Sequence, residues 1–348
     1  MSTHIYRIID ANRNRIGEGL RFLEDIARFI LNDKNTSEQL KSIRHTIVEG
    51  FHTINADLIS ERDAEGDIGA GFDIAQQQRD LPSLITANAK RIEEALRVLE
   101  ELAKLPEISE SFESEKFSQV RFRLYDLESI LFSRVLRSEI IKKVEGVYVI
   151  MDTQLLGPRD ILDCVRQSTS GGARIIQLRD KLYEKGNLYT IAKKIKDICN
   201  ESNALFIIND YLDLALAVDA DGLHLGQNDL PLSVARRVLR VDKIIGYSTH
   251  NLDQALKAEE AGADYIGVGS IFPTTTKEHA DVIGLETLHT IRQAVSVPIV
   301  AIGGINRDNI YSVKQAGADS AAVVSAVFSE RDIRNAVRQM VKEIERKK

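Results

Sequence analysis

The sequence predicts an α/β protein, a (β/α)8 TIM barrel preceded by an N-terminal all-α helical bundle of two repeated hairpins. Three observations support this prediction. Residues 9–24 return in closely similar form as residues 85–100. The first 140 residues carry apolar side chains at steps of three and four, the period of an amphipathic helix. From residue 147 onward, short β-branched runs alternate with helix-sized segments, as they do in a parallel α/β sheet.

The length and charge of the chain limit its class. A chain of 348 residues is long for one domain, and the change of period predicts two, residues 1–140 and 145–348. Lysine and arginine number 46 against 52 acidic residues, and the net charge of −6 gives no support for a nucleic-acid or anionic-membrane partner. No apolar run approaches the roughly 20 residues of a membrane span, and the first residues lack a signal-peptide core. We therefore expect a cytoplasmic protein.

The two cysteines favour the same compartment. Cys164 and Cys199 fall within helical patterns and show neither metal-binding nor redox spacing. We expect both to be core thiols in a reducing environment.

The N-terminal half is expected to form long amphipathic helices. Apolar residues recur on one face from Ile9 to Ile30, with Asp10 as a candidate N-cap. A further helix is expected after each copy of the repeat, around residues 40–54 and 117–136. Two such hairpins, related by a pseudo-twofold axis, would pack as a bundle.

The repeat preserves polar residues as well as apolar ones. Each member of one set has a counterpart in the second copy: Asn12, Arg15, Glu18, Arg21 and Glu24 return as Asn88, Arg91, Glu94, Arg97 and Glu100. These residues could form ion pairs that dock the hairpins, or they could bind an anion, because the planar fork of arginine suits phosphate. A glycine-rich loop at residues 66–73 lacks the Gly-Lys-Ser/Thr ending of a P-loop and is weak support for nucleotide binding.

Eight strands are expected in the C-terminal half, each a short apolar run followed by a helix-sized segment. They are residues 147–150, 173–178, 205–208, 222–225, 243–246, 265–268, 298–301 and 320–323. The segments 261–264 and 316–319 both read Ala-Gly-Ala-Asp, which suits a glycine C-cap that ends one helix before the next strand. Eight strand-helix units in this length indicate a compact barrel, and an open six-stranded sheet is the lesser alternative.

Polar residues follow almost every predicted strand. Asp210 and Asp229 come after consecutive strands, whose carboxyl ends share one face of a parallel sheet, so the two could hold one cation between them. Gly303 and Gly304 after the seventh strand, with Ser325 after the eighth, suit the phosphate cradle common in such barrels. The set predicts a metal-bound diphosphate beside a second phosphorylated molecule.

These motifs resemble thiamine-phosphate synthase across essentially all of residues 145–348. The resemblance is carried by residues 177–181, 209–210, 226–229, 246–248, 274–277, 302–305 and 324–325. It implies that hydroxymethylpyrimidine diphosphate and thiazole phosphate react to give thiamine phosphate and diphosphate.

The resemblance also implies a role for each matching residue. The pyrimidine diphosphate would be bound by Gln177, Leu178, Arg179, Asp180, Lys181, Asn209, Ser248 and Lys277, and the thiazole phosphate by Thr274, Thr275, Thr276, Gly304, Val324 and Ser325. Asp210 and Asp229 would bind Mg²⁺. The implied catalytic residues are Lys277, Arg179 and Ser248, with Lys277 and Arg179 stabilising charge on the leaving diphosphate.

His224 and His250 are expected to be packing or capping residues. Residues 269–284 are expected to form a mobile lid.

The N-terminal half resembles a helical domain fused to some thiamine-phosphate synthases and similar to hydroxymethylpyrimidine-phosphate kinases. The resemblance covers residues 5–135 and implies that this half could make the diphosphate that the barrel consumes. The alternative is a thiazole tautomerase-like barrel with a non-catalytic helical docking or oligomerisation domain. The expected partners are the small-molecule substrates, and a homo-oligomer remains possible.

Overall fold

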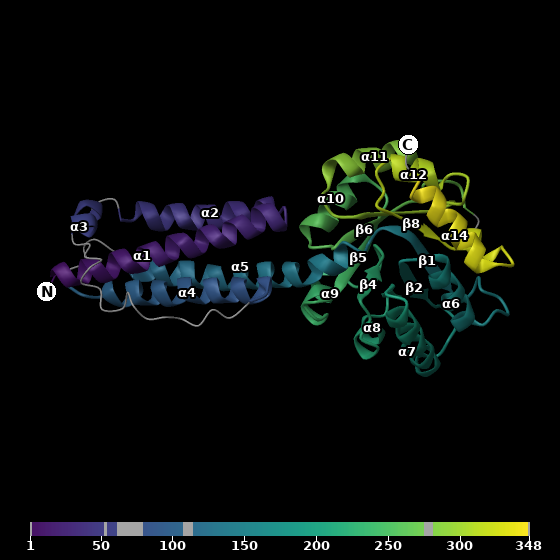
Figure 1. Ribbon diagram of the computed structural model, residues 1–348, viewed down its shortest axis with the longest axis horizontal. Coiled ribbons are helices and arrows are strands. Elements are labelled where there is room, and N and C mark those ends of the chain that lie inside the picture. Colours follow the sequence, from purple (N-terminus) through teal and green to yellow (C-terminus); the bar gives the residue numbers. More distant parts are fainter. Residues whose placement is uncertain (1, 52–53, 61–78, 107–113, 275–280, 347–348) are drawn as a thin grey trace. The chain divides into compact units, whose positions relative to one another are not determined.

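The computed structural model describes residues 2–51, 54–60, 79–106, 114–274 and 281–346. The chain divides into two compact units, Met1–Ser138 and Glu139–Lys348. The first is helical and the second is an α/β barrel (Figure 1).

Long helices that lie side by side build the helical unit (Figure 1). They are α1 (Ser2–Asp25) with the π-helical turn η1 (Ile26–Ile30), α2 (Lys34–Glu49), the short α3 (Asn55–Ser60), α4 (Leu81–Leu102) and α5 (Ser114–Ile141). Helix α1 packs on both α2 and α4. The first of these pairs forms a hairpin, and the second joins the two copies of the repeat. The approach of α1 to α4 requires Gly19, because a Cβ atom there would lie 2.6 Å from Cγ1 of Ile92.

The predicted N-cap at Asp10 is wrong. Asp10 lies in the interior of α1 and is buried, since the helix begins at Ser2. The apolar stripe extends toward the N-terminus through Ile5 and Tyr6, which pack against the core, and their burial extends the helix past the polar residue. A capping side chain is instead found at α4, where Asp80 accepts a hydrogen bond from the Ser83 backbone N–H at 2.9 Å.

The second unit is a closed barrel of eight parallel strands in sequence order. The strands are β1 (Gly146–Asp152), β2 (Ile175–Arg179), β3 (Leu205–Asn209), β4 (Gly222–Leu225), β5 (Ile244–Thr249), β6 (Tyr265–Val268), β7 (Ile299–Ile302) and β8 (Ser320–Val323). The predicted fold class is therefore confirmed, and the open six-stranded sheet is wrong.

Helices surround the barrel (Figure 1). They are α6 (Ile161–Gly171), α7 (Lys185–Glu201), α8 (Leu212–Ala217), α9 (Leu232–Val238), α10 (Leu252–Glu260), α11 (Gly284–Ala294), α12 (Ile310–Gln315), α13 (Ser325–Phe328) and α14 (Ile333–Ile344). Cys164 and Cys199 are buried free thiols in two of these helices, as expected. Within the described parts of the chain, no helix is long and apolar enough to cross a membrane.

Strand side chains alternate between two cores, as the two-residue period of a strand requires. Val147, Val149 and Met151 pack outward under the helices, whereas Tyr148 and Ile150 point into the barrel. The barrel interior is thus filled by side chains, and a ligand can enter only at its ends.

The amino-terminal ends of the strands are tied by aspartates. Asp264 accepts hydrogen bonds from the Ile245 backbone N–H and from Arg236, and Asp319 does the same for the Ile299 N–H and Arg292. Each Ala-Gly-Ala-Asp segment therefore supplies both a glycine that ends a helix and an aspartate, just before the next strand, that binds the start of the preceding strand. These residues stabilise the face opposite the carboxyl ends, and this leaves the carboxyl ends for chemistry.

Candidate active site at the barrel mouth

The carboxyl ends of neighbouring strands bring the predicted site residues together. In the strand register Asp152 pairs with Arg179, and Asn209 pairs with His224. Because all eight strands are parallel, the loops that follow them open at the same end of the barrel. We call this end the mouth.

Asp210 and Asp229 meet at the mouth. Burial raises the pKa of Asp210, and its hydrogen-bonded contact with the Asp229 carboxyl raises it further. Asp210 adopts a left-handed backbone conformation, with φ of 61°, and its backbone N–H donates to the His224 carbonyl at 2.9 Å. Asp229 is held by the Gly226 N–H, which donates to its Oδ2 at 2.7 Å. Both carboxylates are therefore fixed before any ligand arrives.

The Asp210–Asp229 pair fits a hard divalent cation. Two carboxylates held in contact repel each other, and a cation between them would relieve that repulsion while accepting oxygen ligands. The described residues contain no cluster of three or more metal-binding side chains of the His, Cys, Asp and Glu types. This donor set suits Mg²⁺, which commonly takes one or two carboxylates and completes its shell with water and substrate phosphate oxygens.

Two basic residues line the same edge. The Lys181 Nζ lies 3.0 Å from Oδ2 of Asp210, and Arg179 forms an ion pair with the buried Asp152. Both cations keep more than a third of their side-chain surface exposed, 44% for Lys181 and 37% for Arg179, so an anion at the mouth can reach them.

Two predicted substrate residues direct their side chains elsewhere. Leu178 is buried in the outer core under the helices. Asp180 accepts hydrogen bonds from Thr153 Oγ1 at 2.6 Å and from the backbone N–H groups of Leu182 and Tyr183. The Asp180 carboxylate therefore shapes the β2 loop, and neither side chain is available to a ligand.

The predicted phosphate cradle has the backbone that it needs. Gly303 and Gly304 have φ of 100° and 65°, a region that favours glycine. A Cβ atom on Gly304 would lie 2.4 Å from the Pro273 carbonyl oxygen, so this glycine also allows the loop after β6 to approach. Ser325 is exposed at the start of α13. Thr274 precedes the gap in the described residues, and Thr275, Thr276 and Lys277 lie outside them.

A hydrogen-bonded chain crosses the barrel interior below the mouth, and the sequence analysis did not find it. Gln177 Nε2 donates to Tyr148 OH at 2.7 Å, and the Tyr148 and Tyr265 hydroxyls lie 3.2 Å apart. The chain continues from Tyr265 OH to His224 Nδ1 at 3.1 Å and from His224 Nε2 to Ser248 Oγ at 2.9 Å. His224 was expected to be a packing or capping residue, but it connects two predicted substrate residues. The only sequence signal was its position one residue before the end of the predicted strand 222–225.

In the helical unit, the repeated charged residues divide into two groups. Glu24 and Glu100 are buried, and each pairs with an arginine of the following helix, Arg44 at 3.0 Å and Arg121 at 3.3 Å. These equivalent ion pairs join the two helices of each hairpin and support the docking interpretation for those residues. Further members of the set are exposed: Arg15, Glu18, Arg21, Arg91, Glu94 and Arg97.

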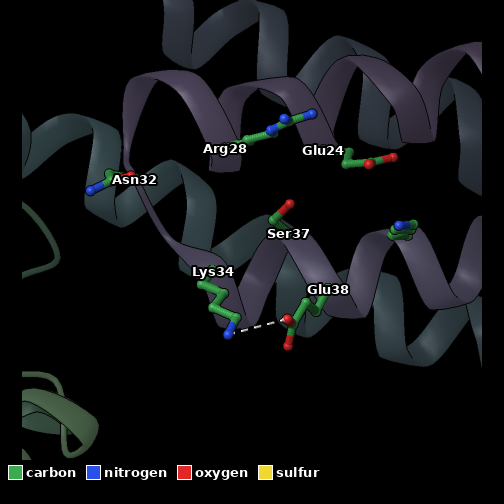
Figure 2. Close-up of a pocket in the computed structure, with 7 residues that line it drawn as sticks. Glu24, Arg28, Asn32, Lys34, Ser37 and Glu38 are labelled. Carbon is green, nitrogen blue, oxygen red and sulfur yellow. Dashed lines mark ion pairs between the residues drawn. The ribbon is translucent and has the colours of Figure 1, made fainter.

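A pocket of about 280 Å³ lies in the first hairpin of the helical unit. Figure 2 shows Glu24 and Arg28 on one helix, with Lys34, Ser37 and Glu38 on the next. Its lining mixes cations with carboxylates, and Lys34 and Glu38 already pair with each other at 3.8 Å. The lining therefore favours neither an anionic nor a cationic ligand.

Two family models match the chain. The model described as thiamine monophosphate synthase matches residues 147–327, and the model of the ThiD2 family matches residues 7–130. The two matches fall on the barrel and on the helical unit respectively.

Curated relatives span both units. A thiamine-phosphate synthase of Synechocystis sp. is 39% identical over 99% of this chain and 97% of its own length. A thiamine-phosphate synthase of Nostoc sp. is 39% identical over 93% of this chain and 90% of its own. Among solved structures, thiamine phosphate pyrophosphorylase from Pyrococcus furiosus is 43% identical with a TM-score of 0.55, and the match covers 59% of this chain and 98% of that one. The predicted resemblance is confirmed, and the chain belongs to the thiamine-phosphate synthase family, as a barrel fused to a ThiD2-family helical domain.

Proposed function

We propose that the barrel, residues 145–348, joins the pyrimidine and thiazole halves of thiamine phosphate at its mouth. The single observation that carries this assignment is the Asp210–Asp229 carboxylate pair, with Lys181 and Arg179 beside it. A hard cation and two exposed basic side chains suit a diphosphate that must leave with its negative charge.

The reaction breaks one bond and forms one. The bond between the methylene carbon of hydroxymethylpyrimidine diphosphate and its bridging oxygen breaks, and the electron pair leaves with the diphosphate. The ring nitrogen of thiazole phosphate donates its lone pair to that carbon, which gives thiamine phosphate. This nitrogen carries no proton, so no general base is needed. A magnesium ion held by Asp210 and Asp229 would supply positive charge to the departing diphosphate.

Side chains at the mouth have separate roles in this proposal. Arg179, Lys181 and Lys277 stabilise the diphosphate, and Gln177, Asn209 and Ser248 hold the pyrimidine. The thiazole phosphate is bound by the loops after β6, β7 and β8, through Thr274, Thr275, Thr276, Gly304, Val324 and Ser325. The two glycines after β7 support this placement, because they have no side chain to cover the loop backbone and they tolerate its positive φ.

A direct assay tests the barrel assignment. The purified full chain is incubated with both substrates and Mg²⁺, and thiamine phosphate and diphosphate are quantified. Equal amounts of the two products, formed only when both substrates and Mg²⁺ are present, are expected. Interconversion of thiazole phosphate tautomers without coupling would instead indicate the tautomerase alternative.

For the helical unit, residues 1–140, we propose ATP-dependent phosphorylation of hydroxymethylpyrimidine phosphate. The support is its resemblance to kinases of that substrate, together with Arg15 and Arg91. Both arginines are exposed, both occupy the same place in the repeat, and neither has a carboxylate partner among the described residues. Packing alone does not account for their repetition, whereas an anionic substrate does.

The full chain again allows a clean test of this second activity. Arg15→Ala and Arg91→Ala should lower ATP-dependent formation of the pyrimidine diphosphate and leave coupling of the ready-made diphosphate unchanged. If the parent chain cannot phosphorylate the monophosphate, the helical unit is a docking or oligomerisation module.

The buried free thiols Cys164 and Cys199 support our further proposal of a reducing, cytoplasmic location.

A further inference from the structure

The chain that runs from Gln177 to Ser248 links five side chains on five different strands. Its two tyrosines, Tyr148 and Tyr265, each keep 1% of their surface exposed, so each hydroxyl depends on its neighbours for hydrogen bonds. Burial raises the pKa of both phenols, so both stay protonated. The His224 ring lies between the Tyr265 and Ser248 hydroxyls, and a neutral imidazole in this place donates from one nitrogen and accepts at the other.

These neighbours leave only two consistent hydrogen-bond arrangements. Each hydroxyl has one hydrogen, and within the described residues each has the partners just named and no others. If Gln177 donates to Tyr148, then Tyr148 donates to Tyr265, Tyr265 donates to His224 Nδ1, and His224 Nε2–H donates to Ser248. If the Gln177 amide turns over, so that its oxygen accepts from Tyr148, every bond in the chain reverses.

The two ends are therefore coupled. In the first arrangement the Gln177 oxygen is free to accept, and the Ser248 hydroxyl is free to donate. In the second arrangement Gln177 offers N–H groups, and the Ser248 hydrogen is committed to His224, so Ser248 can only accept. In both arrangements one end can accept where the other donates: the Gln177 oxygen with the Ser248 hydroxyl in the first, and the Ser248 oxygen with the Gln177 N–H groups in the second.

The barrel is shaped to keep this chain in place. The Tyr265 ring lies across β5 at Gly246, where a Cβ atom would come within 2.1 Å of the ring carbon Cζ. The His224 ring lies beside Gly267, with Cε1 3.2 Å from the position of a Cβ atom there. Small residues on two neighbouring strands thus accommodate the two rings.

We propose that Tyr148, Tyr265 and His224 are positioning residues that couple the polarity of Gln177 to that of Ser248, so that together they recognise one donor and one acceptor on the aminopyrimidine. An aminopyrimidine edge carries an amino donor beside a ring-nitrogen acceptor, which matches this pair. The inference rests on the proposed function of the barrel. It adds three residues that act on the pyrimidine through other side chains.

The test interrupts the chain without emptying the barrel. Tyr265→Phe removes one hydroxyl and keeps the ring, and it should raise KM for the pyrimidine diphosphate by roughly three- to tenfold, the size of one hydrogen bond. KM for thiazole phosphate should stay unchanged. Tyr247→Phe is the matched control, because this β5 tyrosine packs in the outer core and belongs to no part of the chain.

A double-mutant cycle separates positioning from packing. If Tyr265 acts through Ser248, Tyr265→Phe should add less than twofold to the effect of Ser248→Ala. If the two substitutions instead multiply each other's effect on the pyrimidine KM, the inference is overturned. Equal increases of KM for both substrates, together with a lower melting temperature, would also overturn it and leave only a packing role. Tyr148→Phe breaks the chain at a second point, so the test does not depend on one variant folding.

The outcomes also distinguish this inference from the proposed function. A parent chain that forms no thiamine phosphate contradicts the proposed function. If the parent chain is active and both Tyr265→Phe and Tyr148→Phe have the parental KM for the pyrimidine diphosphate, only the positioning role is contradicted.

Discussion

Lys181 donates a hydrogen bond to Asp210, its Nζ lying 3.0 Å from Oδ2, where the proposed magnesium site meets the proposed diphosphate site. This hydrogen bond raises the pKa of Lys181, so the ammonium group stays charged. One cation of the protein therefore already neutralises one carboxylate of the Asp210–Asp229 pair. A magnesium ion and Lys181 compete for the same oxygen until a diphosphate offers Lys181 another partner.

This competition predicts that Lys181→Met strengthens Mg²⁺ binding but weakens binding of the pyrimidine diphosphate. Without substrate, the variant should bind Mg²⁺ more tightly, because the competing ammonium is gone. Its KM for the pyrimidine diphosphate should rise by about tenfold or more, since a hydrogen bond to a charged group contributes about 1.5–3 kcal/mol. Titration calorimetry with Mg²⁺ and steady-state kinetics measure the two effects. Lys185→Met is the control, because Lys185 pairs with Asp213 outside the carboxylate pair. Weaker Mg²⁺ binding by Lys181→Met would contradict the competition.

Asp210→Asn and Asp229→Asn should each abolish magnesium-dependent coupling while the chain stays folded. Each change removes one charge from a hard-cation site but keeps an oxygen that can accept a hydrogen bond, such as the one from the Gly226 N–H. Thiamine phosphate formation is measured across a range of Mg²⁺ concentrations, with Asp213→Asn as the control. Near-parental turnover of either variant at limiting Mg²⁺ would show that the pair does not share the ion.

The phosphate cradle is better tested at Ser325 than at Gly304. A side chain on Gly304 would strike Pro273 and Phe272 and would strain a backbone with φ of 65°, so Gly304→Val damages the loops as well as any ligand site. Ser325→Ala removes only an exposed hydroxyl. It should raise KM for thiazole phosphate about threefold to tenfold, the size of one hydrogen bond, with little change for the pyrimidine diphosphate. Equal shifts for both substrates would place the phosphate elsewhere.

Lys277 remains a prediction from the family resemblance, since it lies outside the described residues. Lys277→Ala should slow the chemical step by about ten- to a hundredfold, because a charge-assisted hydrogen bond to the leaving diphosphate would be lost. Single-turnover measurement with both substrates saturating isolates that step. An unchanged rate would remove Lys277 from the catalytic set.

The strands were predictable because each is a short apolar run that ends at polar or glycine residues. The end of β3 at Asn209, for example, agrees with the sequence to one residue. The Asp210–Asp229 pair was predictable for the same reason, as parallel topology places successive strand ends side by side. Alternation along one strand also indicates which side chains face inward, but it does not indicate which of them meet across the barrel.

The chain through Tyr148, Tyr265 and His224 was missed for that physical reason. Its contacts join residues as far apart in sequence as 117 positions, and they depend on the small residues that make room for the rings. The start of α1 was misplaced because Asp10 is buried inside a helix, and a local capping preference is overridden when tertiary packing buries the stripe on both sides.

The carboxyl groups of Glu93 on α4 and Glu128 on α5 lie against each other in the helical unit, close enough to interact. Burial raises the pKa of Glu93 to about 7, and the neighbouring Glu128 charge adds to the rise. A carboxyl whose pKa is higher in the folded chain contributes stability that is fully present below its unfolded pKa of 4.5 and is lost as the pH rises through about 7. The equivalent positions in the first copy of the repeat hold Gly17 and Phe51, so only the second hairpin has this pair.

The Glu93→Gln variant should therefore be more stable than the parent at pH 8 and should lose that advantage toward pH 5. The amide is neutral at both pH values and can still donate a hydrogen bond to the Glu128 carboxylate, as the protonated acid does. Because the pair is partly exposed and solvent screens it, we expect a gain of only about 1–3 °C in melting temperature at pH 8. Glu94→Gln, on the exposed face of the same helix, should shift the melting temperature equally at the two pH values. If Glu93→Gln also gives a pH-independent difference from the parent, the two carboxyls do not share a proton in the folded chain.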